Sequence, residues 1–443
     1  MGKFTHLSEE VSELYYRGRS ILVTRGEPFQ TLTVKPYEKR AEEELEQTLK
    51  KRMRKDGRQD LIPLRDRVRK YRDKKWMKKE IWLIMDRVDV AGDNGEVFFS
   101  YMTKEHKKEA CYFVIQKDCR DHERMETYGK VLDFGSDAHK EMLLKAKYFV
   151  TSQGEDLLLN PLGEDGKYLK DLLQYKYVFL QHGIIKDDLS GWLHEANKNV
   201  HMFVTSAKKE YESIVQGQYD YGENVVKLTG LPRYDRLKQE KEPEKSVLIL
   251  PTWRTGLAGK LDPVTGLRTK GKDFTQSKYY EFYQSLISDE KLLAAMKEFG
   301  YRGVLALHTR MWEEAGAFQG NDVFTVVGEG MNYREQFLKN RFMVTDYSST
   351  FFDFGYLKKP IIYAQFDRED FYKNQIYDAG YFSYEEDGFG PVCRTVSQTV
   401  DAMIDLLKKD GKIDIKYAQR QEKWYAYQDA EHCHRIYEEI RKL

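Results

Sequence analysis

The sequence has few cysteines and no long apolar run. Only 4 of its 443 residues are cysteine, and they form neither a CxxC pair nor a regular spacing. This pattern argues against a disulfide scaffold or a zinc site and fits a reducing cytoplasm. No apolar run approaches the roughly 18 residues that span a bilayer, and the polar start Met1–Glu9 predicts no signal peptide. Any membrane contact is therefore expected to be peripheral.

Phosphate loops and metal-ligand patterns are also missing. No glycine-rich segment has the spacing of a Walker A loop or of the dinucleotide fingerprint. The acidic pairs Asp187-Asp188 and Asp86/Asp89 do not have the spacing of metal ligands. We therefore expect neither a metal nor a cofactor, because arginine, histidine and a helix dipole can neutralise a phosphate instead.

The charge is nearly balanced overall but unevenly distributed. The formal net charge is +1, whereas Lys50–Lys79 holds 15 Lys or Arg and 4 Asp. Such a segment attracts anionic lipid, a polyphosphate or nucleic acid, although a solvated helical face explains it as well. A nucleic-acid-binding protein would show salt-dependent affinity for random DNA. That alternative leaves the strand-end histidines and arginines described below unexplained, so we expect no nucleic-acid partner.

Short apolar runs alternate with helical stretches along most of the chain. Between residues 80 and 240 the runs are Ile81–Met85, Cys111–Ile115, Val131–Leu132, Tyr148–Thr151, Tyr177–Leu180, Met202–Thr205 and Val225–Thr229. Between residues 245 and 395 they are Val247–Leu250, Val304–His308, Val323–Val327, Phe342–Thr345 and Pro360–Ala364. This alternation is typical of βαβ units and predicts two parallel sheets.

The predicted fold class is α/β, with two Rossmann-like domains at 80–240 and 245–395 that face a cleft. Charged residues and a proline in 236–245 predict a linker between them. Residues 1–79 are expected to form a hairpin and two basic helices, and residues 396–443 to be helical. Ligands of such sheets bind beyond the carboxyl ends of the strands.

The strongest candidate site follows the strand that ends at Val344. Thr345, Asp346, Ser348 and Ser349 lie between this strand and a predicted helix. A helix start presents free N–H groups and partial positive charge, which favour a phosphate. Ordinary capping by Ser348, Ser349 or Thr350 explains the same residues.

Two histidines also end apolar strands. His182 follows Tyr177–Leu180 and precedes Gly183. A histidine on such a turn suits a general base, since its ordinary pKa lies near ~6.5. His308 ends the run Val304–His308, and Arg310 lies two residues on. An arginine beside a histidine suits a diphosphate, which arginine binds in bidentate fashion.

Two more arginines, Arg254 and Arg233, follow strand ends in the same way. For each of these histidines and arginines, a surface or structural role is the alternative. Their joint placement predicts a transferase in which His308, Arg310, Ser348 and Ser349 hold a donor diphosphate that faces the base His182.

Several stretches resemble the CDP-glycerol glycerophosphotransferases of teichoic acid and capsule synthesis. The stretches are Lys79–Gly95, Phe179–Gly183, Leu228–Leu237, Pro251–Arg254, Val344–Phe354, Lys359–Tyr363 and Tyr381–Val392. The resemblance covers about residues 80–400. Family members often have a proline after the second histidine, where this sequence has Thr309.

The resemblance implies a GT-B fold and a peripheral enzyme at the inner face of the cell membrane. It implies transfer of glycerol phosphate from CDP-glycerol to a lipid-linked or polymeric polyol-phosphate acceptor, with release of CMP. The implied catalytic residues are His182 and His308. The implied donor-binding residues are Arg254, Arg310, Thr345, Asp346, Ser348, Ser349 and Asp353, the last near the ribose. The implied acceptor-binding residues are Asn94, Gly183 and Arg233.

Two related activities stay open on the same fold. The donor is CDP-ribitol in one alternative, and the other is a nucleotide-sugar glycosyltransferase or epimerase, since the fold does not settle the donor. One addition and many additions use the same chemistry, so the sequence does not separate a primase from a polymerase.

Overall fold

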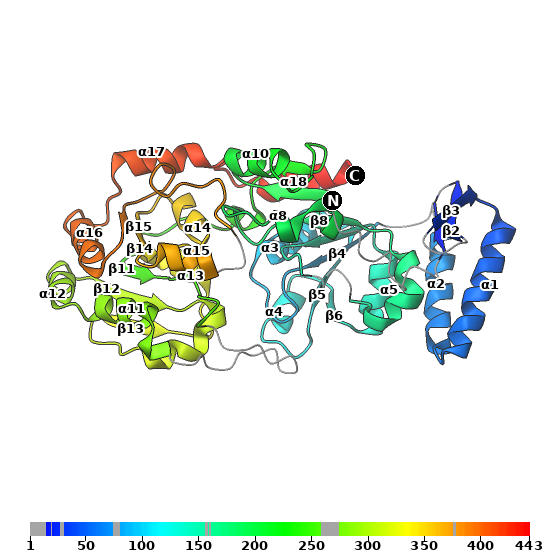
Figure 1. Ribbon diagram of the computed structural model, residues 1–443, viewed down its shortest axis with the longest axis horizontal. Coiled ribbons are helices and arrows are strands. Elements are labelled where there is room, and N and C mark those ends of the chain that lie inside the picture. Colours follow the sequence, from blue (N-terminus) through cyan, green and yellow to red (C-terminus); the bar gives the residue numbers. More distant parts are fainter. Residues whose placement is uncertain are drawn as a thin grey trace. The chain divides into compact units, whose positions relative to one another are not determined.

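The computed structural model describes residues 15–18, 20–26, 31–73, 80–155, 158, 161–257, 274–374 and 378–443. The chain forms two compact units (Figure 1). Unit 1 comprises Met1–His182, Asn199–Phe203 and Glu439–Leu443, and unit 2 comprises Gly183–Lys198 and Val204–Glu438. The predicted linker, residues 236–245, lies inside unit 2. The predicted domain limits and the cleft stay predictions.

The N-terminal part of unit 1 is a small sheet followed by two helices. Strands β1 (Tyr16–Arg17), β2 (Ile21–Gly26) and β3 (Thr31–Pro36) pair antiparallel, which confirms the predicted hairpin. The predicted helices at Ala41–Met53 and Leu64–Met77 correspond to α1 (Lys39–Lys55) and α2 (Ile62–Asp73). Residues 74–79, the end of the predicted second helix, lie outside the described residues.

Ion pairs with acidic side chains neutralise several of the basic residues in Lys50–Lys79. The buried Arg65 guanidinium donates to Glu46 at 2.9 Å and to Asp171 at 2.7 Å. Lys50 bonds Asp66, and Arg67 donates to Glu141 at 2.8 Å. The pairing of Arg65 with Asp171 ties α2 to η4 (Lys170–Leu172) of the same unit. The positive charge that this segment presents to solvent is thus smaller than the count of basic residues in the sequence indicates.

The main sheet is parallel and has seven strands in the order β10-β9-β8-β7-β4-β5-β6. They are β4 (Ile81–Met85), β5 (Ala110–Ile115), β6 (Val131–Asp133), β7 (Tyr148–Thr151), β8 (Lys176–Phe179), β9 (Met202–Thr205) and β10 (Val226–Leu228). Helices of unit 1 beside it are α3 (Asn94–Glu105), α4 (His122–Glu126), α5 (Asp137–Lys145) and α7 (Gly166–Leu169). Every residue of β4 is buried, as expected for a parallel strand with both faces covered.

The unit 2 sheet is also parallel, in the order β13-β12-β11-β14-β15-β16. Its strands are β11 (Glu244–Ile249), β12 (Arg302–Ala306), β13 (Phe324–Val327), β14 (Asn340–Thr345), β15 (Ile361–Ala364) and β16 (Val392–Cys393). The core packs strand residues such as Val247, Leu305 and Val344 against Leu286 and Met403 from helices. These apolar side chains hold the strand ends in fixed register.

Unit 2 contains more helices than unit 1 in the described residues. They are α8 (Ser190–Leu193), α9 (Glu195–Lys198), α10 (Lys208–Gln216), α11 (Lys278–Ser288), α12 (Glu290–Phe299), α13 (Tyr333–Lys339), α14 (Phe351–Tyr356), α15 (Arg368–Asn374), α16 (Val396–Lys408), α17 (Ile415–Trp424) and most of α18 (His432–Arg441). None of the helices in the described ranges is both long and apolar enough to cross a bilayer. The predicted α/β class with two Rossmann-like sheets is confirmed.

Candidate active site

Three adjacent strands of unit 1 end in polar residues. His182 lies just beyond β8, Gln153 just beyond β7, and Asp93 in the segment between β4 and α3. Strands β4, β7 and β8 pair in parallel, so their carboxyl ends lie at one edge of the sheet. This edge is where parallel α/β sheets bind ligands.

His182 is held through one ring nitrogen, and its side chain is largely exposed. Its Nδ1 lies 2.5 Å from Asp93 Oδ2, and its side chain is 71% exposed. The amide nitrogen of Gln153 lies 3.1 Å from the same Nδ1 and 3.5 Å from Asp93 Oδ2. A histidine whose Nδ1 is anchored by a carboxylate has the arrangement of a general base.

The turn that carries His182 is strained and clamped. Gln181 is buried and adopts φ +65°, a left-handed conformation that costs a non-glycine residue about 1–3 kcal/mol. Asn94 is fully buried, and its Nδ2 donates to the Gln181 carbonyl at 2.7 Å. The structure therefore shows Asn94 holding the turn, and its predicted acceptor-binding role stays a prediction.

Asp86 organises the loop beneath His182. Its buried carboxylate accepts hydrogen bonds from Gly95 N at 2.7 Å, Glu96 N at 2.9 Å, Asp93 N at 3.1 Å and Ser152 Oγ at 2.7 Å. Burial, and then the charge of Asp93, raise the pKa of Asp86 to about 7. A Cβ at Gly95 would lie 2.5 Å from the Met85 carbonyl, so this close approach requires glycine.

Three adjacent strands of unit 2 carry the second group of predicted residues. His308 follows β12, Arg254 follows β11, and Asp346–Ser349 follow β14. Strand β11 pairs in parallel with both β12 and β14, so these residues also share one carboxyl edge. The structure thus brings together the predicted donor-binding residues within unit 2.

His308 presents its ring differently from His182. Its Nδ1 accepts a hydrogen bond from Arg310 N at 3.2 Å, at the start of η7 (Thr309–Ala317). A neutral His308 therefore carries its proton on Nε2 and can donate it to a phosphate oxygen. The Arg310 guanidinium lies over the Trp253 ring, 4.3 Å from its centroid. Such stacking fixes a cation while leaving its N–H edges for an anion.

Arg254, Asp346 and Thr345 are structural in this arrangement. Arg254 is 9% exposed in its side chain and donates to Asp346 Oδ2 at 2.8 Å, to Asp367 Oδ2 at 2.8 Å and to the Thr252 carbonyl at 2.7 Å. Asp346 Oδ1 accepts from Thr252 N at 2.7 Å. Thr345 Oγ1 donates to the Leu250 carbonyl at 2.7 Å. These buried bonds shape the loops after β11 and β14, and direct donor contact by these residues stays a prediction.

The serine pair lies just before α14 and is half-buried. Ser348 Oγ accepts from Thr350 N at 3.3 Å and lies 2.8 Å from Thr350 Oγ1. Thr350 takes the N-cap position, but Ser348 supplies the side-chain bond to the backbone. A Cβ at Gly183 would lie 3.5 Å from Ser349 Oγ and 3.3 Å from Arg233 Nη2. Gly183 therefore packs closely beside the predicted donor residues of unit 2.

Arg233 and Asp353 bind each other. Arg233 Nε donates to Asp353 Oδ1 at 2.6 Å and Nη2 donates to Oδ2 at 2.7 Å, a bidentate pair. Arg233 lies in η5 (Pro232–Asp235) and Asp353 in α14. Their predicted contacts to acceptor and ribose stay predictions, and the pair itself was not expected from the sequence.

Sequence reasoning missed Asp93, Gln153 and Trp253. Asp93 directly precedes a helical stretch, where an aspartate is an ordinary N-cap, so its position carried no signal for a catalytic contact. Trp253 lies in the Pro251–Arg254 stretch but has no polar chemistry that marks it. Only the tertiary structure places Asp93 against His182 and Trp253 against Arg310.

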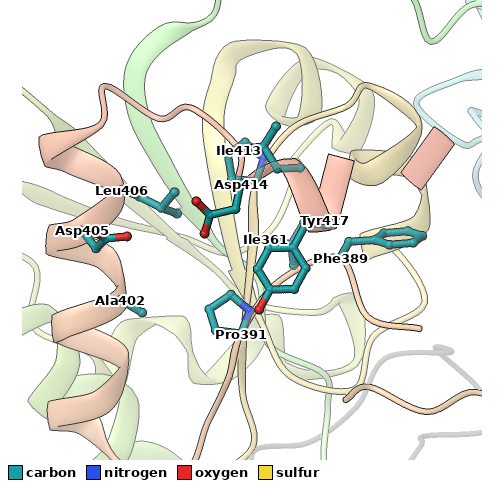
Figure 2. A pocket seen from close by; sticks show the side chains of 10 residues that line it. Ile361, Phe389, Pro391, Ala402, Asp405, Leu406, Ile413, Asp414 and Tyr417 are labelled. Atoms are coloured by element: carbon teal, nitrogen blue, oxygen red, sulfur yellow. The ribbon is translucent and has the colours of Figure 1, made fainter. Parts of the chain in front are cut away.

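A separate pocket lies far along the unit 2 strands from these residues. Its volume is about 50 Å³, and Pro360, Ile361, Pro391 and Tyr417 help line it (Figure 2). Pro360 and Pro391 precede β15 and β16, so the pocket lies at the amino ends of strands rather than the carboxyl ends. Among the described residues, no cluster of three or more His, Cys, Asp or Glu is placed to hold a metal ion.

A comparison with models of protein families shows which family the chain belongs to. The model of the family described as CDP-Glycerol:Poly(glycerophosphate) glycerophosphotransferase matches residues 66–442. The chain belongs to this family. The match includes both carboxyl edges described above and excludes the N-terminal sheet.

Individual relatives agree with the family. The minor teichoic acid biosynthesis protein GgaB of Bacillus subtilis strain 168 is 36% identical over 366 residues, which cover 83% of this chain and 40% of that protein. The teichoic acid poly(ribitol-phosphate) polymerase of Bacillus spizizenii is 25% identical over 193 residues, 42% of this chain and 29% of that protein. The chain therefore spans less than half the length of these two relatives.

A solved structure shares the fold. A variant of the wall teichoic acid polymerase TagF, soaked with CDPG, superposes with a TM-score of 0.59 at 17% identity. The superposition covers 88% of this chain and 97% of that one. This similarity identifies the fold as that of TagF, a GT-B-like fold with two Rossmann-like sheets.

Proposed function

We propose that this chain transfers glycerol phosphate from CDP-glycerol to the terminal hydroxyl of a polyol-phosphate acceptor and releases CMP. The observation that carries the proposal is the edge of unit 2, where His308 and Arg310 follow β12 and the serine pair follows β14, the two strands that flank β11. These groups are donors suited to a diphosphate. Family membership and the CDPG soak of TagF support a CDP-alcohol as the diphosphate.

The proposed chemistry uses one base and one set of phosphate donors. His182 removes the proton of the acceptor hydroxyl, whose oxygen attacks the glycerol-bearing phosphorus in line. The bond from that phosphorus to the bridging oxygen breaks, and the electron pair leaves with CMP. His308 and Arg310 stabilise the charge that develops on the leaving phosphate. Positioning and electrostatics supply most of the acceleration, and we propose that neither a metal nor a cofactor is needed.

We further propose that the N-terminal sheet and α1 meet an anionic membrane surface and the polyanionic acceptor. On one face of the sheet Ile21 is 41% and Val34 60% exposed. On α1 the exposed Lys51, Arg54 and Lys55 are spaced so that they share one face of the helix. Apolar and basic surface together favour binding at an anionic bilayer. Sedimentation with anionic vesicles tests this, and unchanged binding after deletion of residues 1–79 argues against it.

A donor panel tests the transfer itself. The chain is incubated with a polyol-phosphate acceptor and with CDP-glycerol, CDP-ribitol or a UDP-sugar. The masses of the products are then measured by mass spectrometry. We expect CMP release and acceptor extension by glycerol phosphate units from CDP-glycerol. Preferential turnover of CDP-ribitol would move the assignment to a ribitolphosphotransferase, and turnover of UDP-sugars alone would overturn it.

A further inference from the structure

The geometry points to Asp93 as the positioning residue of the base, a carboxylate that fixes the proton of His182 on Nδ1 and directs Nε2 toward the acceptor hydroxyl. This inference rests on the proposed function, in which His182 is the base. It adds a residue to which neither the sequence pattern nor the family match assigns a role. The contact that carries it joins His182 Nδ1 to Asp93 Oδ2 at 2.5 Å.

The chemistry of the pair sets the tautomer. An ionised carboxylate only accepts hydrogen bonds, so Nδ1 of a neutral His182 must donate to it. The lone pair then lies on Nε2, the nitrogen that Asp93 does not touch. The Gln153 amide nitrogen lies 3.1 Å from Nδ1 but cannot donate to a protonated Nδ1, so it donates to Asp93 Oδ2 at 3.5 Å instead. A histidine locked in this tautomer is ready to accept a proton without first exchanging one.

The loop around Asp93 is built to hold that carboxylate. Asp93 Oδ1 accepts from Asn94 N at 2.8 Å at the start of α3, and Asp93 N donates to the buried Asp86. Asn94 reaches across to the Gln181 carbonyl at 2.7 Å. The carboxylate and the histidine turn are thus fixed to each other by two independent bonds, one side chain to side chain and one side chain to backbone.

The charged groups near His182 within unit 1 influence how readily its ring is protonated, and therefore how activity depends on pH. Asp93 touches the ring, and Asp86 lies behind it on the same loop. Glu96 is paired with Arg124 at 2.6 Å and is therefore largely neutralised. Removal of the Asp93 charge should consequently disfavour the imidazolium form of His182, because a nearby carboxylate stabilises that cation.

The experiment compares Asp93→Asn with Asp121→Asn in the full chain. Asparagine is an equally good N-cap, so Asp93→Asn keeps the start of α3. Asp121 accepts from Ala91 N at 3.0 Å and supports the same loop without touching His182. Histidine side chains are labelled with nitrogen isotope, and a proton–nitrogen correlation spectrum reports the tautomer of each ring. The His182→Ala variant identifies the signal among the 10 histidines.

We expect neutral His182 to be protonated on Nδ1 in the parent and in Asp121→Asn, and on Nε2 in Asp93→Asn. In the same variant kcat for CMP release should fall by about 10²–10⁴-fold. In the pH profile of kcat/KM, the fall in activity on the acid side should shift to lower pH by about one pH unit or more. An Nδ1–H tautomer and an unmoved acid limb in Asp93→Asn would overturn the inference.

The spectrum needs no turnover, so it separates this inference from the proposed function. If His182→Ala keeps its activity while Asp93→Asn still changes the tautomer, the contact is real and the catalytic assignment of His182 is wrong. If the tautomer is unchanged but His182→Ala is inactive, the base stands and the role of Asp93 is refuted.

Discussion

The two sheets present the same residue type at the same place but give it opposite hydrogen-bond partners. His182 and His308 each follow a parallel strand, at the carboxyl edge of their own unit. Nδ1 of His182 faces an acceptor, Asp93, whereas Nδ1 of His308 faces a donor, Arg310 N. A neutral His182 therefore offers a lone pair on Nε2, and a neutral His308 offers a proton there.

The buried carboxyl groups near the two histidines also have different partners. Under His182 lies Asp86, a buried carboxyl held by four hydrogen bonds. Next to the His308 edge, the buried Asp346 is paired with Arg254. The first edge thus places carboxyl groups beside its histidine, where they favour a protonated ring, whereas the second pairs its carboxylates with Arg254. In the proposed mechanism, local partners rather than residue type decide which histidine acts as the base.

The largest effect should come from removal of the base. We expect His182→Ala to lower kcat by ~10²–10⁴-fold, because general-base catalysis supplies about that factor. His106→Ala, at the end of α3 in the same unit, is the matched control and should keep parental turnover. CMP release under saturating donor measures both. Near-parental turnover in His182→Ala would remove this residue from the role.

The comparison predicts different rescue patterns for the two histidines. His308→Ala should lower kcat by about 10²-fold, as the loss of one preorganised donor does. His308→Gln keeps an N–H at the outer end of the side chain and should recover part of that loss. His182→Gln has no basic nitrogen and should recover none. Equal rescue at both positions would contradict the assignment of opposite roles.

A smaller effect is expected where Trp253 supports Arg310. Trp253→Leu removes the ring on which the guanidinium stacks, and we expect KM for CDP-glycerol to rise by about 5–10-fold with little change in kcat. Trp192→Leu, at a tryptophan that is 42% exposed in α8, provides the control. Initial rates at varied donor concentration separate the two parameters. A loss confined to kcat would mean that Trp253 does not position a donor-binding group.

The smallest effect concerns stability and pH at Asp86. The pKa of Asp86 is raised from 3.8 to about 7 in the folded chain, so the folded state holds this proton more tightly than the unfolded state. Its part of the free energy of unfolding is full below about pH 4 and is lost as pH rises toward about 7, by at most ~1.4 kcal/mol per pH unit.

Asp86→Asn has no such proton, so the parent should lose its advantage over this variant as pH rises. Urea unfolding at about pH 5 and about pH 8 measures the difference between the two proteins. Asp89→Asn, on the same loop and paired with Arg87, should parallel the parent at both pH values. A difference between parent and Asp86→Asn that does not change with pH would contradict the raised pKa.

Much of the scaffold followed from the sequence. The predicted strands Ile81–Met85, Tyr148–Thr151 and Met202–Thr205 match β4, β7 and β9 residue for residue. Strands buried on both faces are continuous apolar runs with sharp ends, so they can be recognised in the sequence. Strand β16 was not predicted, because its two residues, Val392 and Cys393, are too few to form a pattern.

The candidate site was predictable only as a set of positions. His182, His308 and Ser348 were placed at strand ends because the apolar runs stop there. Arg254 was predicted from its place after a strand, and the structure adds that it is buried between Asp346 and Asp367. Burial of an arginine depends on carboxylates from other parts of the fold, and a single stretch of sequence does not contain that information.

The sequence by itself determined two parallel α/β sheets and the strand ends at which polar chemistry gathers, because apolar periodicity is local. The tertiary structure alone decided which of those polar groups are partners. Asp93 and His182 are 89 residues apart, Arg254 and Asp346 are 92 apart, and Arg233 and Asp353 are 120 apart. Each pairing joins elements that are far apart in the sequence, so the roles proposed for the base, the phosphate-binding groups and their supports emerge only when the chain is folded.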